Sequence, residues 1–215
     1  MKKKIIRIRN YILFYFLMIL SFFRKSSLPV DNNADFIVSI ASYPKRDPLL
    51  PSVFEALSRQ TVLPKKWILV LSVEDYNTKL PKYLRKLQSL GLEILWVKNN
   101  PFAVKKLIPI LNQYPTFAVV TLDDDIIYHR TLLSGLLSKA RQEKNTIIGY
   151  VGKALIRSNE KLKMFNRVDI TPSSKPISNQ IYLIGWGGIY YPPYTLDEKV
   201  KDLKAVHKIV PGRGS

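Results

Sequence analysis

The chain has 215 residues, 47% of them hydrophobic, which is enough to bury one substantial core and excludes an intrinsically disordered protein. It contains no cysteine, so a disulfide framework and a thiolate zinc site are both excluded. The formal net charge is +18, and the segment before residue 26 is rich in lysine and arginine and lacks acidic residues. A surface this basic attracts polyanions such as anionic lipid and phosphorylated substrates.

Residues 1–25 are predicted to form a hydrophobic, membrane-directed helix, because basic residues flank an apolar run from Tyr11 to Phe23. As a helix this run would extend about 20 Å, which is shorter than a hydrocarbon core of about 30 Å. Two interpretations remain open: a helix in the interface of an anionic leaflet at the cytoplasmic face, and a short single-pass signal anchor. A cleaved signal peptide is disfavoured, since no small-residue cleavage site follows the run. Residues 26–34 are predicted to be a polar linker.

Apolar strands alternate with amphipathic helices through residues 35–193, the predicted globular domain. The expected strands are 36–41, 67–72, 92–97, 117–122 and 146–152, and the expected helices are 49–60, 80–90, 101–109 and one beginning near 131. Pro109 predicts a kink or break in its helix, and the polar stretch Arg157 to Ser178 predicts a loop over the site. Short connections without hairpin signals predict an α/β class with a doubly wound, mostly parallel, Rossmann-like sheet.

Three consecutive carboxylates, Asp123, Asp124 and Asp125, follow the apolar strand 117–122. Ligands of open α/β sheets bind at the carboxyl ends of the strands, and three adjacent carboxylates repel one another unless a cation lies among them. Oxygen ligands favour Mg²⁺ or Mn²⁺. The competing interpretation is an acidic turn that caps the helix beginning near Thr131, although a cap needs one acid and not three.

The apolar strand that delivers Asp-Asp-Asp, followed by Ile-Ile-Tyr and a helix, resembles the DxD motif of nucleotide-sugar-dependent glycosyltransferases with the GT-A fold, in particular the family 2-like enzymes. The resemblance covers roughly residues 35–193 in the order of the elements. It implies that Asp125 binds the divalent ion that bridges the donor diphosphate. It also implies that Asp123 reaches the ribose or shares the ion, with Asp124 between them in the nucleotide site.

The same resemblance implies further nucleotide contacts in two other segments. The loop after the first strand matches the uridine-binding loop, so Ser42, Tyr43 and Arg46 are candidates, against the alternative of an ordinary turn. The helix before the DxD strand offers basic residues to the nucleotide, so Lys105 or Lys106 is a candidate. A solvent-facing lysine is the expectation for whichever of the two points away.

A glycine-rich turn, Gly185 to Gly188, surrounds Trp186. Glycines let the backbone approach a ligand closely, and an indole offers a flat face on which a sugar can stack. The resemblance implies that Trp186 and Gly187 help to shape the pocket for the donor sugar and the acceptor. The alternative is a tight glycine bend with a core tryptophan.

Glu74 and Asp75 lie at the end of the second expected strand. Acids at such a position are more often solvated or cap a helix than contact the base or the ribose of a nucleotide. The resemblance implies a further acidic motif behind the glycine-rich turn, which supplies the base that activates the acceptor. This chain departs from that pattern, because residues 194–215 are lysine-rich and their nearest acids are Asp197 and Glu198. These two are the catalytic candidates, and the tail is interpreted as a shortened acceptor region.

The predicted function is therefore a metal-dependent glycosyltransferase that moves a sugar from a nucleoside-diphosphate donor, UDP-linked by resemblance, to a glycan or lipid-linked acceptor in polysaccharide biosynthesis. The alternative is a catalytically impaired, nucleotide-binding relative of such enzymes. A P-loop ATPase is excluded because the chain has no Gly-x-x-x-x-Gly-Lys-Ser/Thr. A nucleic-acid partner is not expected, because no recognised binding module is present.

Overall fold

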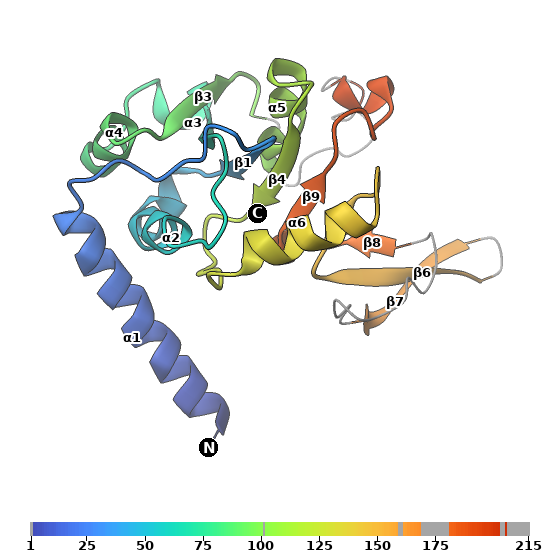
Figure 1. The fold of residues 1–215 in the computed structure, drawn as a ribbon, viewed down its shortest axis with the longest axis horizontal. Coiled ribbons are helices and arrows are strands. Elements are labelled where there is room, and N and C mark those ends of the chain that lie inside the picture. The colour runs from blue at the N-terminus through green and yellow to red at the C-terminus, as the bar shows by residue number, and fades with distance from the viewer. Residues whose placement is uncertain (1, 101, 159–160, 169–180, 203–204, 206–215) are drawn as a thin grey trace.

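The computed structural model describes residues 2–100, 102–158, 161–168, 181–202 and 205. A six-stranded sheet forms the centre, in the order β3–β2–β1–β4–β9–β5 (Figure 1). Its strands are β1 (Phe36–Ala41), β2 (Trp67–Ser72), β3 (Glu93–Val97), β4 (Ala118–Leu122), β5 (Ile148–Gly149) and β9 (Ile189–Tyr191). The neighbours β3, β2, β1 and β4 pair in parallel, and β9 pairs antiparallel with β4 and β5. The predicted α/β class and mostly parallel sheet are confirmed.

Strands β1, β2 and β4 are nearly continuous apolar runs, and every residue of β2 and β4 is buried. Such runs are typical of strands that are covered on both faces. On one face pack α2 (Leu50–Leu57), α4 (Lys82–Ser89) and α6 (Leu132–Gln142). On the other face packs α5 (Ile108–Gln113), which covers a smaller core around Ile37, Ile68 and Val119.

The predicted helix over 101–109 is divided into two pieces. A 3-10 helix, η2 (Phe102–Lys106), is followed by Leu107 and then by α5, with Pro109 in the first turn of α5. Proline is tolerated there because the N–H that it lacks has no intrahelical partner at that position. The predicted break in this helix is present, but it lies at Leu107, two residues before Pro109.

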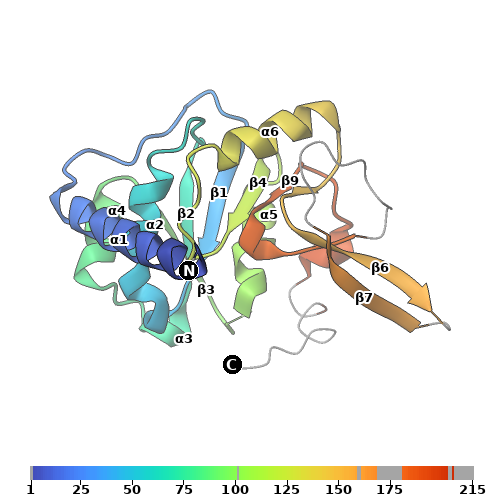
Figure 2. The ribbon, with the colours of Figure 1, turned by 90° about the horizontal axis from the view of Figure 1, so that it is seen from below.

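A second sheet, in the order β7–β6–β8, contains β6 (Gly152–Ser158), β7 (Lys161–Val168) and β8 (Ile181–Leu183). The β6–β7 hairpin projects from the end of the molecule that lies opposite the N-terminal helix (Figures 1 and 2). The predicted loop over 157–178 is wrong for residues 157–158 and 161–168, which lie in β6 and β7. The prediction of a fold without hairpins is wrong as well, because these two strands pair antiparallel. The lysine content concealed an alternation of polar and apolar residues from Lys161 to Met164, which is typical of a strand. Residues 169–180 lie outside the described residues.

The N-terminal segment forms α1 (Lys2–Phe23), which packs along α2. Among the helices in the described ranges, none is both long enough and apolar enough to cross a membrane. The expected polar linker is partly packed against the domain, since Leu28 is buried in the main core and its N–H donates to the carbonyl of Leu90 at 2.7 Å.

Candidate functional site

The carboxyl ends of the four parallel strands bring polar residues to one edge of the sheet. Ser42 follows β1, Ser72 ends β2, Asn100 lies just after β3, and Asp123 follows β4. Parallel strands end at the same edge, and ligands of open α/β sheets bind there. We call the group of Ser42, Arg46, Lys106 and the three aspartates at 123–125 the aspartate cluster.

The central carboxylate of the aspartate cluster belongs to Asp124, which is buried. The hydroxyl of Ser42 donates to its Oδ2 at 2.6 Å. Loss of water around the carboxyl raises the pKa of Asp124, while the Ser42 hydrogen bond and the charge of Arg46 act in the opposite direction. Asp124 is therefore fixed in place and joins the strand ends of β1 and β4.

The two outer carboxylates are more exposed, and each forms an ion pair with a separate cation. Asp125 pairs with Arg46, and Asp123 pairs with Lys106. The pKa of Arg46 is raised by its hydrogen bond with Tyr43 and by the charges of Asp125 and Asp124. Predicted nucleotide-contact residues from the first loop and from η2 thus lie directly against the aspartates.

Tyr128 also holds this strand end, a role that the sequence analysis missed. Its buried hydroxyl accepts a hydrogen bond from the backbone N–H of Asp123 at 2.8 Å. The tyrosine comes only five residues after the aspartate that it fixes. A polar tip on an otherwise apolar side chain, so close behind a strand end, is the signal that could have identified it.

The chemistry of the aspartate cluster suits a hard divalent ion, because Asp123 and Asp125 offer carboxylate oxygens from one short segment. In the described part of the chain, no group of three or more acidic or histidine side chains is arranged to hold a metal ion. A Mg²⁺ or Mn²⁺ site here would consist of these two carboxylates, with substrate phosphates completing the shell. The cations of Arg46 and Lys106 now neutralise the two carboxylates.

Lys105 lies in a second polar cluster next to the first. Its ammonium is buried and lies 3.6 Å from Asp75 Oδ2 and 3.3 Å from the hydroxyl of Ser72. Asn100 donates to both oxygens of Asp75, at 3.3 and 3.2 Å. Burial lowers the pKa of Lys105, and the negative charge of Asp75 opposes that effect. The consecutive lysines therefore differ, with Lys106 directed at the aspartate cluster and Lys105 at the ends of β2 and β3.

The loop between β3 and η2 has an unusual backbone. The φ angles of Asn99 and Asn100 in this loop are 61° and 22°, and that of Phe102, the first residue of η2, is 50°. Asparagine tolerates the left-handed region, but an aromatic residue there costs about 1 kcal/mol. The N–H of Asn99 donates to Glu74 Oε1 at 2.7 Å, and this bond helps to hold the loop. Asn100 is a second residue that the sequence analysis missed, although its place just behind a strand was a usable signal.

The glycine-rich turn lies over the aspartate cluster. A Cβ on Gly185 would lie 3.4 Å from Lys106 Nζ and 3.8 Å from Asp123 Oδ1. Gly187 is required by packing, since a Cβ there would lie 2.7 Å from Val151 Cγ2. The next residue, Gly188, has a φ of 79°, which favours glycine. Trp186 lies between these glycines, and the residue is 39% exposed.

The predicted catalytic acids, Asp197 and Glu198, lie elsewhere. Strand β9 begins opposite Thr121 and ends opposite Val119, so the chain runs away from the aspartates towards the other edge of the sheet. There Asp197 caps the 3-10 helix η4 (Glu198–Lys201) by accepting from the N–H of Lys199, and Glu198 pairs with Lys201. The structure does not bring these two acids together with the aspartate cluster.

No family model and no curated protein matches the chain. Among solved structures, it is similar to a CMP-2-keto-3-deoxy-manno-octonic acid synthetase complexed with CTP, at 12% identity and a TM-score of 0.48, over 84% of this chain and 80% of that one. It is also similar to UTP-bound UGPase from Acinetobacter baumannii, at 10% identity and a TM-score of 0.35, over 81% and 82% of the two chains. UDP-glucose pyrophosphorylase from the same organism gives 10% identity and a TM-score of 0.37, over 82% and 83%. Similarity at this level assigns no function to the chain.

Proposed function

We propose that the chain is a glycosyltransferase that binds a nucleoside-diphosphate sugar, UDP-linked by its resemblance to GT-A enzymes, at the aspartate cluster. The observation that carries the proposal is the meeting of three carboxylates and two cationic side chains at the carboxyl edge of a parallel sheet. Binding sites of open α/β sheets lie at this edge. The acceptor is proposed to be a glycan or a lipid-linked sugar.

Release of a diphosphate leaves negative charge that must be stabilised in the transition state. Arg46 and Lys106 are suited to that task, because each is a cation whose present partner is a partly exposed carboxylate. When donor binds, we expect both side chains to turn from Asp125 and Asp123 towards the diphosphate oxygens. A bound Mg²⁺ or Mn²⁺ would supply Lewis-acid neutralisation of the diphosphate, with Asp123 and Asp125 as its protein ligands.

Other residues at the edge position the donor. Trp186 belongs to the glycine-rich turn and is partly exposed, and its indole is proposed as the face on which the sugar stacks. The amide of Asn100 and the carboxylate of Asp75 form a hydrogen-bonding pair next to Lys105, which is suited to the polar edge of a base or to a ribose.

A second candidate is a relative that binds the nucleotide but transfers poorly. Its support is the position of Asp197 and Glu198, which lie on η4 and away from the aspartates. An inverting transfer needs a carboxylate within hydrogen-bond reach of the acceptor hydroxyl. On this alternative, the donor half of the reaction is retained and the acceptor-activating base is missing.

Calorimetric titration of UDP and UDP-sugars, with and without Mn²⁺, tests the common element of both candidates. We expect UDP to bind and Mn²⁺ to strengthen its binding. Sugar transfer to an added glycan or lipid-linked acceptor then separates the two, since turnover supports the enzyme and binding without turnover supports the impaired relative. Absence of UDP binding under both conditions would overturn both candidates.

A further inference from the structure

Helix α1 is apolar on two opposite faces. Phe14, Leu17 and Met18 recur at helical spacing and face the domain, with Leu17 buried, and the small polar Ser21 continues this face. The opposite face carries a stripe of large apolar side chains, each more than half exposed: Ile12, Phe16, Ile19, Phe22 and Phe23. We call these five residues the outer stripe. An apolar helix face of this length is normally covered in the functional state, because its exposure to water is unfavourable.

The inner face of α1 is part of the folded domain. All eight residues of α2 are buried, because the sheet covers one side of α2 and α1 covers the other. The hydroxyl of Ser52 on α2 donates to the carbonyl of Phe14 at 3.0 Å. From Phe14 to its carboxyl end, α1 therefore follows the surface of the domain.

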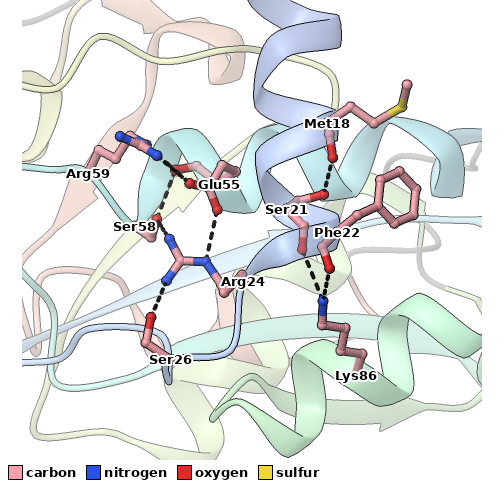
Figure 3. Close-up of polar contacts among 9 residues, drawn as sticks. All are labelled: Met18, Ser21, Phe22, Arg24, Ser26, Glu55, Ser58, Arg59 and Lys86. Carbon is pink, nitrogen blue, oxygen red and sulfur yellow. Dashed lines mark hydrogen bonds and ion pairs between the residues drawn. The ribbon is translucent and has the colours of Figure 1, made fainter.

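A polar clamp, consisting of Arg24, Glu55 and Lys86, fixes the carboxyl end of α1 (Figure 3). Arg24 Nε lies 2.8 Å from Glu55 Oε2, and the same guanidinium donates to Ser58. Lys86 on α4 donates to two carbonyls in the last turn of α1, that of Ser21 at 3.1 Å and that of Phe22 at 2.7 Å. A cation at a helix carboxyl end satisfies orphan carbonyls and complements the helix dipole, so the clamp orients α1 relative to the sheet.

The helical layer formed by α1, α2 and α4 has one sign of charge. Its sequences contain one acidic residue, Glu55, and that carboxylate is buried between Arg24 and Arg59. Exposed cations of the same layer and its carboxyl-terminal flank include Arg9, Lys25 and, on α4, Lys82 and Arg85. This surface would repel a second copy of itself, and it is complementary to an anionic one.

We propose that the outer stripe of α1 inserts into the interface of a bilayer that contains anionic lipid, with the helix lying parallel to the membrane and clamped to the domain. The apolar side chains enter the boundary between headgroups and acyl chains, and the cations of this layer contact lipid phosphates. A bilayer-spanning position is incompatible with the docked helix, because lipid cannot surround a segment whose inner face packs on α2. The clamp then gives the aspartate cluster a fixed orientation relative to the membrane surface.

Vesicle flotation of the full chain tests whether the membrane is the partner. We expect binding to phosphatidylcholine vesicles that contain roughly 30% phosphatidylglycerol, weaker binding to pure phosphatidylcholine, and weakening by salt. The double variant Phe16→Ser/Phe23→Ser should bind about tenfold less tightly or worse. Tyr194→Ser, an exposed aromatic outside the helical layer, is the matched control and should bind like the wild type.

A pair of tryptophan variants tests the orientation of the helix. Phe14→Trp and Phe16→Trp make the same chemical change two residues apart, on opposite faces of α1. In vesicles with brominated acyl chains, the added fluorescence of Phe16→Trp should be quenched strongly and that of Phe14→Trp weakly. Native Trp67, Trp96 and Trp186 provide a background that is measured in the unsubstituted protein.

Each outcome decides the proposal. Binding to anionic vesicles together with one-sided quenching supports it. Equal quenching at both positions would show that α1 has left the domain or spans the bilayer, which overturns the clamped orientation. Failure to bind vesicles overturns the membrane as partner. A stable dimer in light scattering that the double variant dissociates would assign the outer stripe to a second copy instead.

Discussion

The α1–α2 junction and the aspartate cluster both combine carboxylates with cationic side chains, yet they differ in burial. At the α1–α2 junction, Glu55 is 3% exposed and lies between Arg24 and Arg59. In the aspartate cluster, Asp123 and Asp125 are 29% and 30% exposed, and each has one cation. Water therefore competes for the aspartates and is excluded from Glu55.

This difference separates a structural ion pair from an exchangeable one. Removal of one partner from a buried pair leaves an uncompensated charge without water, which is strongly unfavourable. A partly exposed pair can open at small cost, because solvent replaces the lost partner. The clamp is thus suited to hold two elements together, whereas the aspartate cluster is suited to exchange its cations for a ligand.

The largest effect on stability is expected at the buried carboxylate. Glu55→Ala should lower the free energy of unfolding by about 3–5 kcal/mol, because Arg24 loses its partner in a largely buried position. Urea denaturation measures the change. Arg59→Ala is the matched control, and it should cost less than about 1 kcal/mol since the Arg59 side chain is 53% exposed. Equal losses in the two variants would remove the distinction between the clusters.

At the aspartate cluster, the expected effect is on ligand affinity and not on stability. Asp125→Ala should weaken Mn²⁺-dependent UDP binding by about 100-fold, corresponding to the loss of one charged metal ligand worth about 2.7 kcal/mol. Calorimetry measures the affinity, and thermal melting should show little change, because removal of one like charge relieves repulsion among the aspartates. Glu143→Ala, at the exposed end of α6, is the control for loss of one acid. Unchanged affinity in Asp125→Ala would contradict the proposed site.

Asp124 should reveal its burial through the pH dependence of stability. Burial raises the pKa of the Asp124 carboxyl in the folded protein above its ordinary value of 3.8. The contribution of this group to the free energy of unfolding is therefore largest below pH 3.8, and it is lost as the pH rises through the raised pKa. Asp124→Asn keeps the acceptor for Ser42 and removes the charge, so the variant should be the more stable protein at pH 7 and should lose this advantage at pH 3. Thermal melts across this range measure the difference, with Glu143→Gln as the charge control. An advantage that grows towards acid pH would contradict the assignment.

The smallest effect is expected for the acids behind β9. Asp197→Ala/Glu198→Ala should leave UDP affinity within about twofold and cost about 1 kcal/mol of stability, because one acid is a helix cap and the other an exposed pair. Calorimetry and urea denaturation test both values. A large loss of affinity would mean that η4 approaches the nucleotide on binding. Sugar transfer that depends on either acid would restore them as catalytic candidates.

Strands β1, β2 and β4 could be predicted because they are nearly continuous apolar runs with clear ends. The proximity of Ser42, Arg46 and the three aspartates followed from one rule, namely that parallel strands end at the same edge. Their functional roles remain predictions. Strand β9 was not predicted, because its three residues are too few to show a strand pattern or to separate a parallel from an antiparallel partner.

Long-range polar pairing was beyond the sequence. Arg24 and Glu55 are separated by 31 positions, and no periodicity links a residue at the end of one helix to a residue on the next. Which of Lys105 and Lys106 faces the aspartates was also hidden. Successive residues of a 3-10 helix point about 120° apart, and the docking of the helix decides which of the two is directed at the cluster. The β6–β7 hairpin was not predicted for another reason, because the many lysines of this segment are typical of a loop and obscure its alternation of polar and apolar residues.

Helix α5 covers the second face of the sheet, and this has a consequence for local unfolding. The helix is six residues long and begins two positions after Lys106, so any ligand that immobilises Lys106 also restrains the entrance to α5. Local opening of α5 would expose the smaller core around Ile110 and Val119. Occupation of the aspartate cluster should therefore slow hydrogen exchange of the α5 amides, on the face remote from α1.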